Sequence, residues 1–167
     1  MGVWQHYRGT EALTLDSLLL RKLFRRRNKA EATSPKKTPF PSGVRVLVVD
    51  DSKTFQYSTH KMLKQAGVET LQALDGELGL KMARRFKPEL ILMDVVMPGI
   101  NGFQATRELH RDPETKDIPV IIVSGNAEAT EQFWVLKVGA VDFMSKPFTR
   151  KELMEKLNRY LSKNDVA

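Results

Sequence analysis

The sequence predicts an α/β protein with a doubly wound parallel sheet. After residue 43, short apolar runs alternate five times with longer segments whose apolar residues recur at helical spacing. The apolar runs are nearly continuous, as expected of strands that are covered on both faces of a sheet. Because crossovers between parallel strands are right-handed, such a chain places helices on both faces and forms three layers.

Each predicted strand is a short run rich in valine, leucine and isoleucine, which suits a buried strand. Charged or turn-forming residues bound most of these runs, so each strand has a clear end. In chain order the strands cover residues 44–49 (VRVLVV), 68–73 (VETLQA), 89–93 (ELILM), 118–123 (IPVIIV) and 140–144 (AVDFM).

Each predicted helix follows a strand, and most have a residue that suits a helix end. In the first helix, an apolar stripe of Phe55, Thr59, Met62 and Leu63 faces the sheet. The helices are 52–66, ended by Gly67; 75–86, capped by Asp75 and ended by Pro88; 102–111, capped by Asn101; 127–138; and a last helix that Thr149 caps and that reaches Leu161.

This (βα)5 pattern predicts a flavodoxin-like sheet with strand order 2-1-3-4-5. In that order the first and third strands flank the point where the direction of winding reverses, and ligands bind beyond the carboxyl ends of the strands there. The roughly 120 residues involved are enough for a stable core.

The chain divides near residue 43. Residues 1–29 form a basic amphipathic extension with a short predicted helix in TLDSLLLRKLFRRRNK, residues 30–43 form a flexible linker rich in Pro, Ser, Thr and Lys, and residues 44–163 form the main domain. Residues 1–43 hold 9 Lys and Arg against 3 Asp and Glu, and the remainder hold 18 against 17. The high net charge therefore belongs to the N-terminal part, and we expect no DNA binding by the nearly neutral main domain.

Composition excludes several classes of site. The chain has no cysteine, so it contains neither disulfides nor thiolate ligands nor a cysteine nucleophile. No apolar run reaches the roughly 18 residues that span a membrane, and the first residues lack the features of a signal peptide. We therefore expect a cytoplasmic protein.

Polar residues stand where the apolar runs end. Asp50 and Asp51 follow the first run, Asp94 the third and Ser124 the fourth, and Lys146 lies just past the fifth. Because parallel strands end at one edge of the sheet, these side chains should converge. Clustered carboxylates need a cation, and their oxygens are ligands that suit Mg²⁺. A magnesium ion beside a lysine and a hydroxyl makes a place for a phosphoryl group.

Four segments closely resemble the receiver domain of two-component response regulators. The combination of motifs and spacings, rather than any single motif, is specific to that family, and it covers residues 44–162. The segments are VLVVDDS (46–52), LMDVVMPGING (92–102), PVIIVSG (119–125) and DFMSKPF (142–148). The stretch MDVVMPGINGFQATREL is most similar to regulators of chemosensory type IV pilus (twitching) systems.

The resemblance implies that Asp94 is the phospho-acceptor, whose carboxylate attacks the phosphoryl group carried by a histidine kinase. It implies Mg²⁺ as cofactor, bound by Asp50, Asp51, Asp94 and the backbone carbonyl of Val96. The metal and a nearby cation would screen the approach of one anion to another.

Three further roles come from the resemblance. Lys146 would pair with the phosphate, the Ser124 hydroxyl would donate a hydrogen bond to it, and Phe143 would be the aromatic switch that moves inward. Pro147 matches the family's usual cis proline. Phe143 stands where tyrosine is common and Ser124 where threonine is common, and neither difference removes the chemistry.

These roles predict a stand-alone phospho-accepting response regulator of a two-component or chemosensory phosphorelay, with type IV pilus motility as the indicated output. Phosphorylation would change the face made by the helix over 127–138, the fifth strand and the last helix, and a downstream protein would bind there. We expect no enzymatic activity beyond Mg²⁺-dependent phosphotransfer to itself and self-dephosphorylation.

Other interpretations stay open for the extension. Its helix would rest lightly on the main domain, dock a protein, or lie on an anionic membrane surface. Arg21 and Arg25 have an R-x-x-x-R spacing, so the alternative function is a receiver-like effector that binds a cyclic dinucleotide or a membrane through this leader.

Two enzyme or redox classes fit less well. A haloacid-dehalogenase-like phosphatase needs a D-x-D motif after its first strand, whereas Asp50 and Asp51 are adjacent. A flavodoxin-like redox protein needs a phosphate-cradling loop there, and DDSKTFQ places negative charge in it.

Overall fold

The structure, a computed structural model, describes residues 40–125, 135 and 137–161. The chain divides into two units between Lys37 and Thr38, and all described residues lie in the second. The basic extension, most of the predicted linker and most of the predicted helix over 127–138 lie outside the described residues, and their predicted roles stay predictions.

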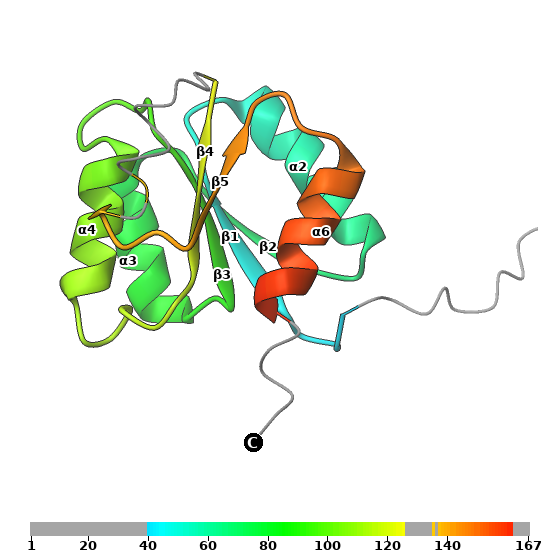
Figure 1. Cartoon of the computed structure of the whole chain (residues 1–167), viewed down its shortest axis with the longest axis horizontal. Coiled ribbons are helices and arrows are strands. Elements are labelled where there is room, and N and C mark those ends of the chain that lie inside the picture. The colour runs from blue at the N-terminus through cyan, green and yellow to red at the C-terminus, as the bar shows by residue number, and fades with distance from the viewer. Residues whose placement is uncertain (1–39, 126–134, 136, 162–167) are drawn as a thin grey trace, which may run out of the picture. The chain divides into compact units, whose positions relative to one another are not determined.

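A five-stranded parallel sheet forms the centre of the described unit (Figure 1). The order is β2-β1-β3-β4-β5, which confirms the predicted doubly wound, flavodoxin-like fold. The strands are β1 (Arg45–Val49), β2 (Glu69–Ala73), β3 (Leu90–Asp94), β4 (Val120–Ser124) and β5 (Asp142–Ser145).

Helices cover both faces of this sheet, with α2 and α6 on one side and α3 and α4 on the other (Figure 1). Among the described residues the helices are α2 (Lys53–Gln65), α3 (Gly76–Phe86), α4 (Gly102–Arg111) and α6 (Arg150–Leu161).

Most of the predicted helix ends are confirmed by their capping bonds. Asp75 accepts a hydrogen bond from the Leu78 amide at the start of α3, and Asn101 and Gln104 form a reciprocal capping box at the start of α4. Gly67 adopts a left-handed conformation just after α2. These bonds satisfy amides that the first helical turn cannot pair, so each loop turns into its helix at a defined residue.

Two apolar layers fill the space between the sheet and its helices. Successive strand residues point to opposite faces, so Leu47 and Val49 pack toward α3 and α4 whereas Val46 and Val48 pack toward α2 and α6. Every residue of β3 and β4 is buried, as the continuous apolar runs predicted. The rigid centre of the sheet therefore fixes where Asp94 and Ser124 emerge.

One residue of the predicted linker belongs to this core. Phe40 is only 4% exposed and joins the apolar layer under α2 and α6. Packed structure therefore begins at least four residues before the predicted first strand. Over the described residues, no helix combines the length and apolarity needed to cross a bilayer.

Candidate functional site

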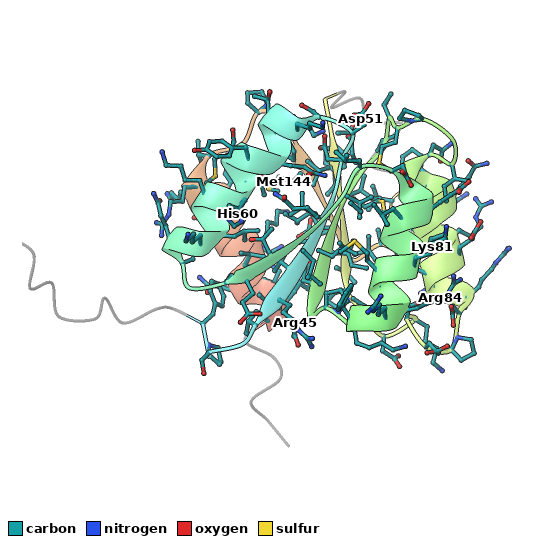
Figure 2. The ribbon with its side chains drawn as sticks, turned by 180° about the vertical axis from the view of Figure 1, so that it is seen from behind. Arg45, Asp51, His60, Lys81, Arg84 and Met144 are labelled. Carbon is teal, nitrogen blue, oxygen red and sulfur yellow. The ribbon has the colours of Figure 1, made fainter. Side chains whose placement is uncertain are left out.

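Three acids meet at the carboxyl end of the sheet. Asp50 and Asp51 follow β1 and Asp94 is the last residue of β3, so the pairing of β1 with β3 brings them together. One carboxylate oxygen from each acid lies within 4.8 Å of the others. Figure 2 shows Asp51 at the end of the sheet opposite Arg45, the first residue of β1. The predicted convergence of these acids is confirmed.

Lys146 brings an ammonium group into this cluster. Its Nζ lies 2.5 Å from Asp50 Oδ2 and 2.9 Å from Asp94 Oδ1, and its side chain is 20% exposed. The Lys146 amide also donates to the carbonyl of Ser124 at 2.7 Å, which places the lysine backbone, just after β5, beside the C-terminal end of β4. A compact cation therefore bridges the acids of two strands from a third segment of the chain.

Burial divides the three acids into two kinds. Asp50 and Asp94 are 1% and 6% exposed, whereas Asp51 is exposed. Desolvation raises the pKa of the Asp94 carboxyl, and the nearby Asp50 carboxylate adds to the rise, which outweighs the opposing effect of the Lys146 ammonium. A buried carboxylate beside another acid favours a bound cation, because a cation restores the charged form.

Asp50 is held on both of its carboxylate oxygens. The Ser52 amide donates to Oδ1 at 2.9 Å, and Lys146 binds Oδ2. The buried side chain of Gln56 fixes the backbone there, because its amide donates to the carbonyls of Asp50 at 2.8 Å and Ala73 at 2.6 Å. Sequence reasoning missed Gln56, although a polar residue on the inner face of a helix is a signal that could have found it.

Ser124 and Phe143 lie where the sequence placed them. Ser124 ends β4 and is 1% exposed, and Phe143 is the second residue of β5, opposite Ile122. The Phe143 side chain is half-buried against the apolar layer on the α3 and α4 side. The switch role of Phe143 stays a prediction.

The loop after β3 passes close behind Asp94. The Gly102 amide donates to the Val95 carbonyl at 3.0 Å, and a Cβ at position 102 would overlap the backbone carbonyl oxygen of Asp94. Glycine is therefore required for the first turn of α4 to reach the acid. Val96, whose carbonyl is a predicted metal ligand, is 72% exposed in this loop.

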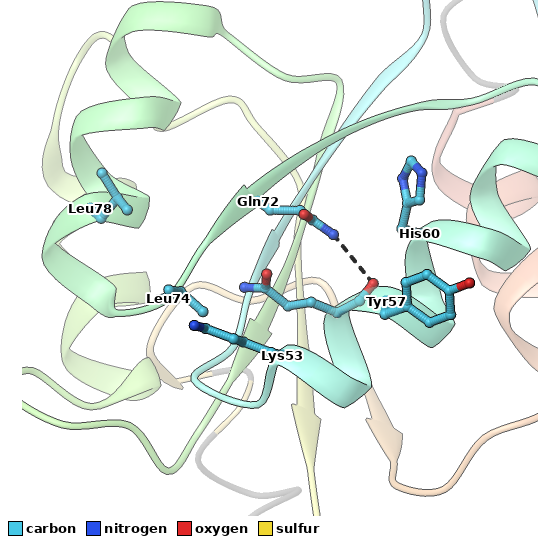
Figure 3. Close-up of a pocket in the computed structure, with 7 residues that line it drawn as sticks. Lys53, Tyr57, His60, Gln72, Leu74 and Leu78 are labelled. Atoms are coloured by element: carbon cyan, nitrogen blue, oxygen red, sulfur yellow. Dashed lines mark hydrogen bonds between the residues drawn. The ribbon is translucent and has the colours of Figure 1, made fainter.

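A separate groove lies beside the acid cluster, along α2, β2 and the start of α3 (Figure 3). In it the Gln72 side chain donates to the carbonyl of Gln56 at 3.3 Å, and Tyr57 is 69% exposed. The residues that line it are Lys53, Gln56, Tyr57, His60, Gln72, Leu74 and Leu78. None of the three clustered acids lines this groove, so it is distinct from the predicted site.

Residues 46–158 match the family described as the response regulator receiver domain. The chain belongs to the response regulator receiver family. This membership agrees with the strand order and the acid cluster, both of which the sequence predicted, and with the position of Lys146 beside Asp94.

Among curated proteins, this receiver is 45% identical to Protein PilH of Pseudomonas aeruginosa over 118 residues, which are 71% of this chain and 98% of PilH. It is also 35% identical to the phosphate regulon transcriptional regulatory protein PhoB of the same organism over 119 residues, 71% of this chain and 52% of PhoB. The receiver thus spans nearly all of PilH and about half of PhoB.

Solved structures of receivers share the fold. Chemotaxis protein CheY4 of Vibrio cholerae is 29% identical with a TM-score of 0.67, and the match covers 71% of this chain and 98% of CheY4. The receiver domain of the sensor histidine kinase PA1611 from Pseudomonas aeruginosa is 30% identical with a TM-score of 0.68, and the match covers 72% of this chain and 99% of that domain. That domain holds a magnesium ion in its active site cleft.

Proposed function

We propose that this receiver accepts a phosphoryl group on Asp94 and passes the signal on by protein contact. The observation that carries the proposal is the buried Asp94 carboxylate, which lies 2.9 Å from the Lys146 ammonium inside a cluster of three acids. A carboxylate oxygen of Asp94 forms the new P–O bond while the P–N bond of a phosphohistidine donor breaks, and the imidazole leaves. A histidine kinase is the donor that suits this chemistry.

The residues present fit a magnesium ion. Three carboxylates with oxygens within 4.8 Å form a set of hard ligands, and Asp50, Asp51 and Asp94 would hold the ion together with the Val96 carbonyl. When bound, Mg²⁺ supplies positive charge to the oxygens of the transferring group. Lys146 contributes a second positive charge from this chain, already placed against Asp94, and so needs little reorganisation.

Ser124 and Phe143 would read out the phosphorylated state. Ser124 is the last residue of β4, and its backbone carbonyl accepts a hydrogen bond from the Lys146 amide, which supports a role beside the lysine. In this proposal the Ser124 hydroxyl donates a hydrogen bond to a phosphoryl oxygen. Added negative charge would then bias Phe143 and the face made by the predicted helix over 127–138, β5 and α6. A downstream protein rather than DNA is the proposed partner of that face.

A stand-alone cytoplasmic role in a pilus system is the finer part of the proposal. It is supported by the 45% identity to PilH across nearly the whole of that protein and by the similarity of MDVVMPGINGFQATREL to type IV pilus regulators. We propose that the activity is limited to phosphotransfer onto Asp94 and its hydrolysis.

Intact mass spectrometry after incubation with a small acyl phosphate and Mg²⁺ tests the acceptor. The wild-type chain should gain one phosphoryl group, and chelation of Mg²⁺ should prevent the gain. Asp94→Asn should gain nothing, because an amide is not a nucleophile toward phosphorus. Phosphorylation of Asp94→Asn at the wild-type rate would overturn the assignment.

A further inference from the structure

One aromatic side chain in α2 contacts the cation of the acid cluster. Phe55 is half-buried near the start of α2, and the Lys146 Nζ lies over its ring at 4.2 Å from the ring centroid. The sequence places Phe55 in the apolar stripe of this helix, and it does pack on the layer shared by α2 and α6. Its ring thus serves the core and also faces the ammonium.

The Phe55 ring is a third partner of the Lys146 ammonium. Asp50 and Asp94 contact Nζ at 2.5 and 2.9 Å, and the π-face of Phe55 contacts it as a third partner. A ring face carries partial negative charge and attracts a cation, most strongly where water is excluded. With only 20% of its side chain exposed, Lys146 meets that condition.

The same ring also contacts the residue two positions beyond the lysine. The Phe55 and Phe148 rings lie with centroids 5.4 Å apart and planes at 90°, which is a favourable edge-to-face arrangement. The Phe55 ring therefore contacts both the charged ammonium of Lys146 and the aromatic ring of Phe148. This links the β5–α6 loop to α2, next to the residues that follow β1.

We propose that Phe55 is a positioning residue that holds the Lys146 ammonium against Asp94 by a cation–π contact. The inference rests on the proposed function of Asp94 as acceptor. A lysine side chain has four rotatable bonds. If its ammonium is not held in place, each phosphotransfer must include the entropy cost of ordering it. With Phe55 in place the cation is already at the acid, so phosphotransfer is faster than with an aliphatic residue of similar size.

The first test measures the contact without any metal or phosphate. In a ¹H–¹³C spectrum, ring current from Phe55 should shift the ε-methylene protons of Lys146 upfield of ordinary lysine values. Phe55→Leu should return them to ordinary values, and Tyr57→Leu, which removes an exposed aromatic two positions along α2, should leave them shifted. Unshifted protons in the wild-type chain would overturn the proposal.

The second test separates charge attraction from packing. Phenylalanine carrying one, two or three fluorines, introduced at position 55 alone, keeps the shape of the ring while its π-face loses negative charge stepwise. The rate of phosphorylation by an acyl phosphate should fall stepwise along this series, and Phe55→Leu should lower it about tenfold. Urea unfolding should change little along the fluorinated series, whereas a purely structural Phe55 would give equal rates throughout.

The outcomes distinguish this inference from the function on which it rests. If the wild-type chain is not phosphorylated at all, the proposed function fails while the spectrum still tests the contact. If the wild-type chain is phosphorylated and the fluorinated series gives a constant rate, Asp94 remains the acceptor and Phe55 is not its positioning residue.

Discussion

Asp94 carries its negative charge in a position that opposes ionisation. Its carboxyl is 6% exposed, and desolvation together with the Asp50 carboxylate raises its pKa above the ordinary value despite Lys146. The folded chain therefore binds a proton here more tightly than the unfolded chain does. This contribution to stability is complete below the ordinary carboxyl pKa and is lost as the pH rises through the pKa of the folded state.

Replacement of Asp94 should therefore make the metal-free protein more stable at neutral pH. Asp94→Asn removes the buried charge and keeps the shape, so its free energy of unfolding should exceed the wild-type value at pH 7. The difference should vanish as the pH falls below the ordinary carboxyl range, because both side chains are then neutral. Urea unfolding of both proteins in the presence of a chelator, repeated across this pH range, measures the difference in their free energies of unfolding. A less stable Asp94→Asn at pH 7 would contradict the direction.

Gly102 controls how closely α4 approaches the same acid. Gly102→Ala would drive a Cβ into the backbone carbonyl of Asp94, and such overpacking should lower the free energy of unfolding by about 1–3 kcal/mol. Gly125→Ala is the matched control, since a Cβ at that glycine meets nothing within 4 Å. Chemical denaturation compares the two variants, and equal stabilities would show that the loop relaxes freely.

At the scale of elements, a charged cluster ties the start of β5 to α6. The Asp142 carboxylate accepts from Lys156 at 2.6 Å, Tyr160 at 2.9 Å and Arg159 at 3.3 Å, and from the amide of Phe143 at 2.8 Å. Desolvation opposes ionisation, but the hydrogen bonds from Lys156, the Phe143 amide and Tyr160, with the charge of Lys156, hold the pKa of Asp142 below its ordinary value. The strand that carries Phe143 is thus fixed to α6 at its first residue.

Loss of the Asp142 charge should weaken the attachment of β5 to α6. Asp142→Asn should lower the free energy of unfolding by about 1–3 kcal/mol at pH 7, because hydrogen bonds to a charged acceptor are lost. The stabilisation is present above the ordinary carboxyl pKa and disappears as the pH falls through the lowered pKa of the folded state. Glu155→Gln, in the exposed pair with Lys151, is the control and should have little effect at either pH.

At the scale of the whole molecule, Phe40 extends the core beyond the repeating strand–helix units. Phe40→Ala should lower the free energy of unfolding by about 3 kcal/mol, because it opens a cavity under α2 and α6. Ser42→Ala, at an exposed position in the same segment, should change it little. Thermal or urea unfolding of the full chain decides between a core role for Phe40 and a mere surface contact.

The strands, the described helices and the acid cluster could be predicted from the sequence because each rests on local pattern. Continuous apolar runs identify strands buried on both faces, and polar residues at the ends of four of the five runs mark the edge where parallel strands end. Asp50, Asp94 and Lys146 meet for that reason, although they are far apart along the chain.

The partners of individual side chains could not be predicted in the same way. The apolar spacing of α2 identifies Phe55 as inward-facing, yet the cation against it comes from a loop 91 positions later. Phe40 follows a segment with the composition of a linker, and its burial depends on where the chain turns before β1. Such contacts are set by the three-dimensional packing of segments, which periodicity does not encode.

The balance of charge at the end of the sheet has a consequence for when the protein can respond. Three carboxylates face one ammonium, so with every group ionised the pocket has two more negative charges than positive ones. This excess of negative charge would repel an anionic phosphodonor in the absence of a divalent ion, and a divalent ion alone would bring no group to transfer. If Asp94 is the acceptor as proposed, we therefore expect phosphotransfer only when the divalent ion and the phosphodonor are bound at the acid cluster together.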